Sequence, residues 1–341
     1  MFPSYIEVKQ DLEADIAQLV IARNKFQSEI KKILLIVGSI ALVVGLIVIM
    51  IDSQQSQDLY WISLGIVVLI VLIVIVVKFD RLRRTFKQKF VSKMAQAVVS
   101  KCQFPNQTDA YVYHCQYEPE KHVSRSYMEQ SQLFPYRIDK IQGEDLFSGK
   151  LGVTDFQFSE MKLIQTQTTT NSKGQTKRVD VTMFKGILFV ADFHKSFDGM
   201  TTLHAENVLT NSFIGKMMVS PIRKVMRDLN VGETRLSIDL ESEAFNEAFE
   251  ILTTNEIEAR YLLSSNMMER ILAFRERHKQ KIEISFVDSL ICISMNTNKN
   301  YFELKMNGKD LEKELQHIYE DLLFFFGTIE AFDLNTRIWS K

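Results

Sequence analysis

Two long apolar runs constrain the fold of this chain more than any other feature. The runs cover residues 33–51 and 60–77, contain no charged side chain, and consist mostly of Ile, Val and Leu. An α-helix rises about 1.5 Å per residue, so about 19 residues span roughly 28 Å, close to the hydrocarbon thickness of a bilayer. The short connector between the runs, DSQQSQDL, forces the chain to reverse. The sequence therefore predicts a transmembrane hairpin of two antiparallel helices at residues 33–78.

Basic residues on both flanks predict the orientation of this hairpin. They precede the first run and follow the second, whereas the connector carries only Asp52 and Asp58. Short loops rich in Lys and Arg stay on the cytoplasmic side of a membrane. We therefore expect both termini in the cytoplasm and the connector outside. The flanking basic residues are Arg23, Lys25, Lys31 and Lys32 before the hairpin, and Lys78, Arg81, Arg83, Arg84, Lys87, Lys89 and Lys93 after it.

Composition limits the environment and the partners. The 41 Lys and Arg residues balance 42 Asp and Glu residues, so no global charge points to a nucleic-acid partner. Cys102, Cys115 and Cys292 are odd in number and lack a paired spacing, which favours a reducing compartment over a disulfide framework. The segment before the first apolar run is polar and acidic, and no small-residue cleavage site follows that run, which argues against a signal peptide.

Residues 1–32 form the first predicted region, with an amphipathic helix at 4–32. Its apolar stripe recurs at alternating four- and three-residue steps and includes Arg23. One interpretation is a short coiled coil that makes the protein a homo-oligomer. The other is a helix that packs on the protein's own domain or along the membrane surface, and the charge of Arg23 favours it. The apolar members of the stripe are Leu12, Ile16, Leu19, Phe26 and Ile30.

A basic juxtamembrane helix is predicted at residues 79–103. Near a membrane surface, each positive side chain contributes about 1 kcal/mol of attraction to anionic lipid. One interpretation is a contact with lipid headgroups, and the other is that these charges only set the topology. The residues expected to make the lipid contact are Lys78, Arg81, Arg83, Arg84, Lys87 and Lys89.

The remaining residues, 104–341, predict a cytoplasmic domain of the α+β class, with helices on the faces and ends of antiparallel sheets. Its strand-rich parts, 136–205 and 232–341, are either two subdomains or one sheet system. An irregular passage with at most one short helix is expected at 104–136. Strands are predicted at 136–141, 145–151, 154–162, 163–169, 178–184, 186–193, 234–240, 257–262, 281–287, 290–295 and 301–304, with a hairpin tip at 170–177. Helices are predicted at 212–229, 242–250, 266–278 and 310–330.

Four separated blocks of this domain have a familiar order. They are GEDLFSGKLGVTDFQFSEMKL (143–163), FKGILFVADFHKSF (184–197), ILTTNEIEARYLLSSNMMERIL (251–272) and LNTRIWSK (334–341). Together they resemble a bacterial membrane-anchored family, the domain of unknown function thirty-one thirty-seven, over residues 85–341. The resemblance implies a multi-pass protein of the bacterial inner membrane with a tethered cytoplasmic domain. It implies no reaction, and members often carry Asn in place of His194, which argues against a catalytic imidazole there.

Few side chains suggest chemistry. No phosphate-binding loop, dinucleotide fingerprint or nucleophile elbow occurs, and we predict no catalytic or cofactor-binding residue. If the chain were an acid–base catalyst, its best candidate carboxylates would be Asp192, Glu144 and Asp145. We expect Asp192 instead to cap the turn that contains His194. One group of Cys and His residues lacks the C-x-x-C or H-x-x-x-H spacing of zinc sites, so we predict no metal site. This group is Cys102, His114, Cys115 and His122.

The chain end carries Arg337 and Trp339, which form either a plug in the domain core or a patch that binds a partner. Taken together, these features predict a membrane-tethered, non-enzymatic module that binds a protein partner or ligand at the inner face of the membrane. The alternatives are an enzyme that acts on a membrane-proximal substrate and a sensor of anionic lipid.

Overall fold

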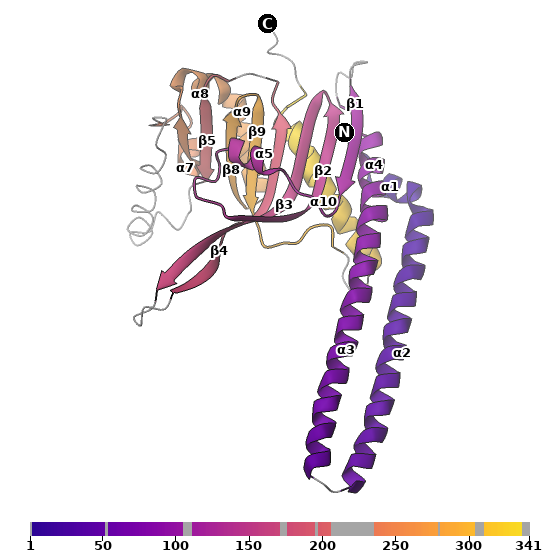
Figure 1. Ribbon diagram of the computed structural model, residues 1–341. Helices are drawn as coiled ribbons and strands as arrows, with labels where there is room; N and C mark the ends of the chain where they lie inside the picture. Colours follow the sequence, from indigo (N-terminus) through magenta and orange to yellow (C-terminus); the bar gives the residue numbers. More distant parts are fainter. Residues whose placement is uncertain are drawn as a thin grey trace. The chain divides into compact units, whose positions relative to one another are not determined.

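The computed structural model describes residues 2–51, 54–104, 111–170, 176–194, 197–205, 235–278, 280–303 and 310–335 (Figure 1). The chain divides into two compact units. Unit 1 comprises residues 1–3, 95–302 and 318–341, and unit 2 comprises residues 4–94 and 303–317. The predicted helix at 212–229 and most of the predicted hairpin tip at 170–177 lie outside the described residues.

Unit 2 consists mainly of helices. A capping box begins the first of them, because the Ser4 hydroxyl accepts a hydrogen bond from Glu7 N while the Glu7 carboxylate accepts one from Ser4 N. Leu12 separates α1 from α2, so the predicted helix at 4–32 is two helices. The second continues into the first apolar run, as predicted. The elements are α1 (Tyr5–Asp11), α2 (Glu13–Ile51), α3 (Gln54–Phe86), the π-helical turn η1 (Lys87–Val91) and α4 (Ser92–Ser100), which begins in this unit.

The helices α2 and α3 pack side by side and antiparallel (Figure 1). Their contacts show the direction, because the residue number rises on one helix as it falls on the other. Near the end of α3, the Phe79 ring lies 6.0 Å from that of Phe26 on α2. One residue earlier on α3, Lys78 Nζ lies 2.5 Å from Oε2 of Glu29, which is later on α2. Beyond α3, Lys93 Nζ lies 2.5 Å from Asp15 Oδ1. Unit 2 is therefore a helical hairpin closed by ion pairs at its charged end.

Within the described residues, one helical stretch, Trp61–Ser100, is long and apolar enough to cross a membrane by length and composition. No residue of its most apolar window is buried. The structure thus shows one candidate span, not the predicted pair. The side chains of the first apolar run are described only as far as residue 46.

Unit 1 is built on an antiparallel sheet in which nine strands have the order β1-β2-β3-β4-β9-β8-β5-β7-β6. Both strand-rich parts of the sequence contribute to it. The α+β class is therefore confirmed. The strands are β1 (Val112–Glu118), β2 (Lys140–Gly152), β3 (Thr154–Thr170), β4 (Thr176–Asp192), β5 (Met200–Ala205), β6 (Leu236–Ile238), β7 (Phe249–Thr253), β8 (Lys281–Val287) and β9 (Leu290–Asn296).

Five of the predicted strands are parts of the three long strands β2, β3 and β4, and a sixth, 136–141, overlaps β2 only at residues 140–141. The register shifts between Glu144 and Phe147 in β2, and it shifts again at Met183 of β4, opposite Leu163 and Ile164 of β3. Such irregularities interrupt the apolar–polar alternation along a continuous strand, which is why the pattern predicted breaks. The predicted strands that became β6, β8 and β9 are confirmed, whereas β1, β5 and β7 were not predicted.

Two predicted strands are wrong. Residues 257–262 belong to helix α8 (Glu256–Leu262), which begins where the Asn255 side chain accepts a hydrogen bond from Glu258 N. Two acidic residues in its first turn favour the same assignment. The predicted edge strand at 301–304 is also not formed, since Tyr301–Glu303 lie outside any strand.

Helices cover both faces of the sheet. On one face, α5 (Arg125–Gln130) and its flanks pack Met128 and Leu133 on Leu163 and Leu188. On the other face, α10 (Leu311–Ala331) presents phenylalanine rings from its second half. The Phe325 ring lies 4.5 Å from that of Phe158 on β3. The neighbouring strands β2 and β4 bury Phe147 and Phe189. The remaining helices are α7 (Glu243–Ala248) and α9 (Ser265–His278), close to the predicted helices at 242–250 and 266–278.

Candidate functional site

The apolar surface of unit 2 is the most unusual feature of the described residues. Large side chains are exposed along α3 from Trp61 to Val77, and along α2 from Leu34 to Leu46. A soluble monomer rarely exposes a contiguous apolar patch beyond a few hundred Å², and larger patches mark membrane or protein contacts. On α2 the exposed residues are Leu34, Leu35, Ile36, Ile40, Leu42, Val43, Val44 and Leu46. On α3 they are Trp61, Ile62, Ile66, Val67, Val68, Leu69, Ile70, Leu72, Ile73, Val74, Val76 and Val77.

The six residues expected to contact lipid headgroups differ in their environments. Arg81, Arg84 and Lys89 are exposed, and Arg84 pairs with Asp80 on its own helix at 3.0 Å. Lys78 is half-buried and pairs with Glu29, and hydrogen bonding from Lys78 lowers the pKa of Glu29. Arg81, Arg84 and Lys89 are thus the three of the six whose side chains lie at the surface of unit 2.

The other two of the six residues are held inside unit 2 by one carboxylate. Arg83 Nη2 lies 2.5 Å from Glu303 Oε1, and Lys87 Nζ lies 2.7 Å from the same oxygen. Lys87 is only 3% exposed. These two cations therefore fix the segment that follows β9 to the end of α3, rather than facing outwards.

The stripe of the N-terminal helix is buried within unit 2. Leu12, Leu19 and Arg23 are each less than 9% exposed. The Arg23 guanidinium, the charged member of the stripe, lies 3.5 Å from Glu314 Oε1, and both side chains are 8% exposed. Because a partner within the same chain occupies this face, a coiled coil between copies would need to displace it.

In unit 1, a two-stranded arm extends beyond the sheet (Figure 1). The pairing of β2 with β3 ends at Lys140 and Ile164, and the pairing of β4 with β9 ends at Gly186. The residues beyond, 165–170 of β3 and 176–181 of β4, pair only with each other. Apart from Val179 and Val181, the described side chains of this arm are polar, and most are exposed.

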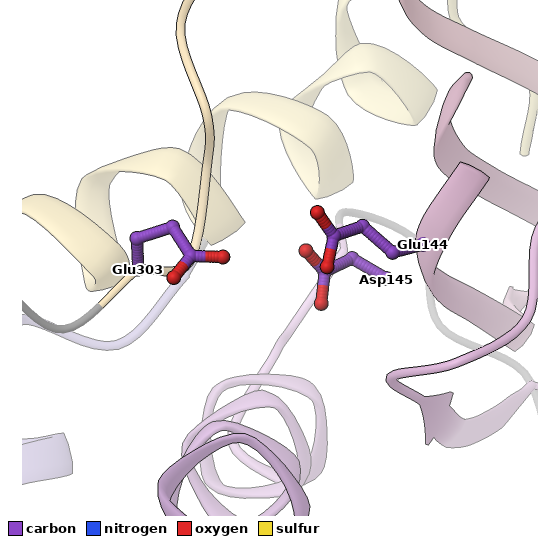
Figure 2. Close-up of side chains that lie close together, drawn as sticks. All are labelled: Glu144, Asp145 and Glu303. Carbon is purple, nitrogen blue, oxygen red and sulfur yellow. The ribbon is translucent and has the colours of Figure 1, made fainter. Parts of the chain in front are cut away.

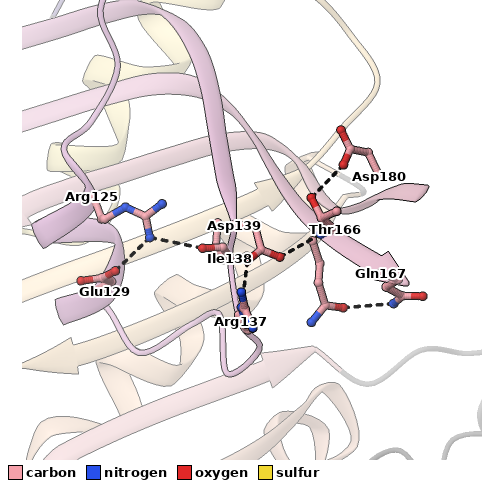
Figure 3. A network of polar contacts seen from close by, with 9 residues as sticks. Arg125, Glu129, Arg137, Ile138, Asp139, Thr166, Gln167 and Asp180 are labelled. Atoms are coloured by element: carbon pink, nitrogen blue, oxygen red, sulfur yellow. Dashed lines mark hydrogen bonds and ion pairs between the residues drawn. The ribbon is translucent and has the colours of Figure 1, made fainter. Parts of the chain in front are cut away.

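A polar network braces the base of the arm (Figure 3). Thr166 N donates to Asp139 Oδ2 at 2.8 Å, and the Thr166 hydroxyl donates to Asp180 Oδ1 at 2.8 Å. Lys140 Nζ lies 2.7 Å from the other oxygen of Asp180. The bond from Thr166 N lowers the pKa of Asp139, and the bonds from Lys140 and Thr166 lower that of Asp180. Both carboxylates are thus ionised acceptors.

The Asp192 carboxylate caps a turn at the end of β4. Its Oδ1 accepts a hydrogen bond from His194 N at 2.8 Å, and its Oδ2 lies 3.1 Å from His194 Nδ1. His194 has a φ of 55°, in the left-handed region that turns require. Asn, which the resemblance implies for this position, also tolerates that region.

Glu144 and Asp145 lie at the irregularity of β2 in unit 1 (Figure 2). Asp145 has a φ of 62° and is 1% exposed, and Tyr117 Oη donates to its Oδ1 at 2.5 Å. Asp145 N donates to the carbonyl of Pro119 at 3.1 Å. Glu303, the third carboxylate drawn in Figure 2, belongs to unit 2. The buried Asp145 therefore connects the distorted strand to β1.

The predicted group of Cys and His residues does not converge on a common point in the described structure. His114 and Cys115 are consecutive on β1, so their side chains point to opposite faces of the sheet. His122 instead places Nδ1 2.8 Å from the carbonyl of Val123. The remaining candidates, Arg337 and Trp339, lie outside the described residues.

A cluster on β5 and β8 was not identified from the sequence. His204 Nε2 lies 3.1 Å from Thr202 Oγ1, and His204 Nδ1 lies 3.7 Å from Glu283 Oε2. Lys281 Nζ lies 2.8 Å from the other oxygen of Glu283. Burial favours the neutral form of Glu283, but His204 and Lys281 outweigh it and lower the pKa. The sequence does show alternating polar residues in KIEIS (281–285) and TTLH (201–204). However, only the pairing of β5 with β8 shows that these polar residues lie side by side.

Part of this chain matches a known protein family. Residues 182–334, which are 153 of the 341 residues, match a family described as "Protein of unknown function (DUF3137)". The resemblance predicted from the sequence is thus confirmed for that region, although the match shows no membrane anchor. No curated protein matches the chain in a sequence search.

One similar solved structure is the crystal structure of the mycobacterial trehalose monomycolate transport factor A, TtfA. It shares 9% sequence identity with this chain, at a TM-score of 0.27. The alignment covers 62% of this chain and 87% of that one. A similarity of this size carries no argument about fold or function.

Proposed function

We propose that unit 2 anchors the chain in a bacterial inner membrane through a hairpin of two spans, residues 33–51 and 60–77. Unit 1 is then a non-enzymatic module on the cytoplasmic side that binds a protein partner or ligand near the membrane. The exposed apolar surface of α2 and α3 carries this proposal.

The free energy of transferring that apolar surface from water into a bilayer is strongly favourable. Removing a Leu, Ile or Val side chain from water is worth about 1.5–3 kcal/mol. More than a dozen such side chains are exposed on the two helices of unit 2. In the bilayer core, a helix also satisfies its own backbone hydrogen bonds, so continuous helices such as α2 and α3 are suited to span it.

The charge distribution supports the orientation. Lys31 and Lys32 are exposed on α2 just before the first apolar run, and Arg81 is exposed on α3 just after the second. The ion pair of Glu29 with Lys78 lies between these two ends and marks the boundary of the apolar surface. Because Lys and Arg near the spans stay in the cytoplasm, this end of the hairpin and both chain termini are cytoplasmic.

The described surface of unit 1 supports a role in binding. Ile257 is 84% exposed, Tyr261 is 58% exposed one turn later on α8, and Leu236 on β6 is 47% exposed. Aromatic and apolar residues are common at the centres of protein interfaces. The arm of β3 and β4 adds a second exposed element.

Two experiments test this function. Alkaline carbonate extraction of membranes should leave the full chain in the pellet, and release into the supernatant would contradict the anchor. For the binding role, a photo-crosslinking residue at Ile257 should capture one discrete protein in intact membranes, with Lys121, exposed elsewhere in unit 1, as the control position. Equal capture at both positions, or none, would contradict a partner surface at α8.

A direct contact with anionic lipid is a second candidate function, favoured by the exposure of Arg81, Arg84 and Lys89 next to the span. At about 1 kcal/mol per residue, each neutralisation should lower lipid affinity about fivefold. Native mass spectrometry of the detergent-solubilised chain should show retained phosphatidylglycerol, reduced in the triple variant R81Q/R84Q/K89Q. Unchanged retention would rule out this contact, and Lys121→Gln is the matched control.

A further inference from the structure

The arm of β3 and β4 leaves one edge of β4 without a neighbouring strand. Residues 176–181 pair with β3 on one side. On the other side, no described strand pairs with them, because the pairing of β4 with β9 stops at Gly186. Every second residue of this edge directs its backbone N–H and C=O groups away from β3, and such a row of unpaired groups can accept another strand. An added strand would also support the arm, since a ribbon of two strands is marginally stable in water.

The alternation of these backbone groups limits how a second copy of the same edge can pair with it. In an antiparallel ladder, two directly opposed residues either both turn their N–H and C=O groups towards each other or both turn them away. Two identical edges turn the same residues outwards. A residue can therefore lie opposite only its own equivalent or a residue an even number of positions away. A two-fold contact between copies then has one residue at its centre, opposite its own equivalent.

The charges of residues 177–180 select one centre. A contact centred on Lys177, Arg178 or Asp180 would place two like charges directly opposite each other, which is unfavourable. A contact centred on Val179 instead places Arg178 of each copy opposite Asp180 of the other. Opposite charges, β-branched pairs and Thr–Thr pairs all stabilise antiparallel ladders. From the centre outwards, the opposed pairs are Val179–Val179, Arg178–Asp180, Lys177–Val181 and Thr176–Thr182.

The side chains that this pairing needs lie at the surface of unit 1. Residues 176–180 are all exposed, and Val179 is 38% exposed although it is apolar. Asp180 accepts a hydrogen bond from Thr166 at one oxygen and pairs with Lys140 at the other. A carboxylate has about four lone-pair sites, so Asp180 can also accept from Arg178 of a second copy.

We propose that two copies of this chain associate through the β4 edges of their arms. The edges run antiparallel, are centred on Val179, and join the two arms into a ribbon of four strands. The contact involves few residues on each copy, and interfaces of this small size are typical of weak or transient association. The pairing depends neither on the membrane anchor nor on the surface at α8.

Disulfide cross-linking of the full-length chain in detergent micelles tests the centre of this contact. Opposed Cα atoms of antiparallel strands are about 4.5–5.5 Å apart, within the range of about 4.4–6.8 Å that a disulfide bridges. Val179→Cys should therefore form a disulfide-linked dimer under a mild oxidant, while the buried native thiols do not react.

Gln167→Cys is the matched control, because Gln167 is exposed and lies directly opposite Val179 on β3. Neighbouring strands are about 4.8 Å apart, so the two copies of residue 167 would be separated by roughly 14 Å across the ribbon. Gln167→Cys should therefore remain monomeric under the same oxidant. Equal cross-linking of the two cysteine variants would show random collision or another edge, and would overturn the proposal.

The charge pair is tested in the Val179→Cys background. Arg178→Glu places a carboxylate opposite Asp180 of the other copy and should lower the cross-linked fraction about fivefold or more. Lys177→Glu makes the same change of charge one residue earlier, opposite Val181, and should change the fraction by less than about twofold. Near-UV circular dichroism checks that the variants are folded.

Amide hydrogen exchange of the wild-type chain gives a readout without any substitution. Exchange at residues 176–182 should slow as the concentration of the chain is raised, because outward N–H groups become hydrogen-bonded to a second copy. Arg178→Glu should remove this dependence on concentration. Exchange that is independent of concentration in the wild type, no disulfide-linked dimer of Val179→Cys, or undiminished cross-linking of folded Arg178→Glu would overturn the proposal.

Discussion

Single side chains connect segments of unit 1 that are far apart in the sequence. Asn335, in the last described turn, accepts hydrogen bonds at Oδ1 from Val153 N at 3.0 Å and from the Thr154 hydroxyl at 3.1 Å. This contact depends on Gly152, which has a φ of 69° in the turn between β2 and β3. A Cβ atom at Gly152 would lie 2.6 Å from Asn335 Oδ1. The end of the domain is therefore held by a polar contact that only glycine permits.

Gly152→Ala should lower the free energy of unfolding by about 1–3 kcal/mol, because the new methyl group both clashes with Asn335 and disfavours the positive φ. Thermal unfolding of the full chain measures this. Gly327→Ala is the matched control, since no atom within 4 Å would meet the added Cβ in helix α10. This control should be neutral or stabilising by up to about 1 kcal/mol. Equal stability of Gly152→Ala and the wild type would contradict the account.

The three thiols should be unreactive in the folded chain. Burial raises the pKa values of Cys102, Cys115 and Cys292 to about 12, so almost no thiolate forms at pH 8. A thiol reagent monitored by mass spectrometry should modify none of them before unfolding, and all three in urea. Rapid modification of the native chain would contradict this burial.

The same shifts predict the sign of a pH dependence. In the unfolded chain these thiols ionise near their ordinary pKa of 9.0, whereas the folded chain keeps its protons up to a pH of about 12. The native state then binds more protons than the unfolded state, so stability should fall as the pH rises above 9. A melting temperature that is constant between pH 8 and 11 would contradict this prediction.

At the scale of elements, the arm of β3 and β4 and the helices of unit 2 depend on a few ionic contacts. A ribbon of two strands is marginally stable in water, so the arm needs the bonds that Lys140 and Thr166 make with Asp180. In unit 2, α10 begins beside α2 through the buried pair of Arg23 and Glu314. A buried pair of this kind is costly to break by removing one partner.

Asp180→Asn should loosen the arm without unfolding the sheet. Amide hydrogen exchange should speed up at residues 164–168 and 176–182, while the melting temperature stays constant. Asp155→Asn, which changes a carboxylate that pairs with Lys150 at 2.9 Å within the sheet, is the control. The pKa of Asp180 is lowered, so its carboxylate stays ionised in mild acid. Acid should therefore speed up exchange in the arm only as the pH falls through this lowered pKa. Equal exchange in both variants would count against the brace.

Glu314→Gln should destabilise unit 2 by about 3 kcal/mol, because it removes the charge of the carboxylate that pairs with the buried Arg23 guanidinium. The double variant R23M/E314L should recover most of that loss, since it removes both charges. Thermal unfolding in detergent compares the single and double variants. If the double variant is as unstable as the single one, the pair does not stabilise the packing of α2 and α10 in this way.

At the scale of the whole molecule, features that extend over many residues were easier to predict from the sequence than the local geometry of single strands and turns. The apolar runs and their basic flanks are visible because each extends over many residues. The strands β8 and β9 were predicted because they alternate regularly, and α9 because Ser264 precedes an apolar periodicity. Where the pairing of β2, β3 and β4 is irregular, the pattern predicted breaks that do not exist.

Contacts between distant segments could not be predicted from the sequence. His204 and Glu283 are far apart along the chain, and only the register of β5 with β8 brings them together. Arg23 was recognised as an anomaly in an apolar stripe, but its partner Glu314 follows from the packing of α10. The sequence makes the basic residues after the second apolar run look equivalent, although the structure buries Lys87 and exposes Arg81.

Membrane-impermeant maleimide labelling of single introduced cysteines in intact bacteria tests the central claim most directly. The native thiols are buried, so Ser4→Cys, Gln55→Cys and Lys121→Cys report the positions before the hairpin, in the connector and after it. The anchor with two spans predicts labelling of Gln55→Cys alone, and labelling of all three variants after permeabilisation. Labelling of Ser4→Cys or Lys121→Cys in intact cells, or no labelling of Gln55→Cys, would contradict it.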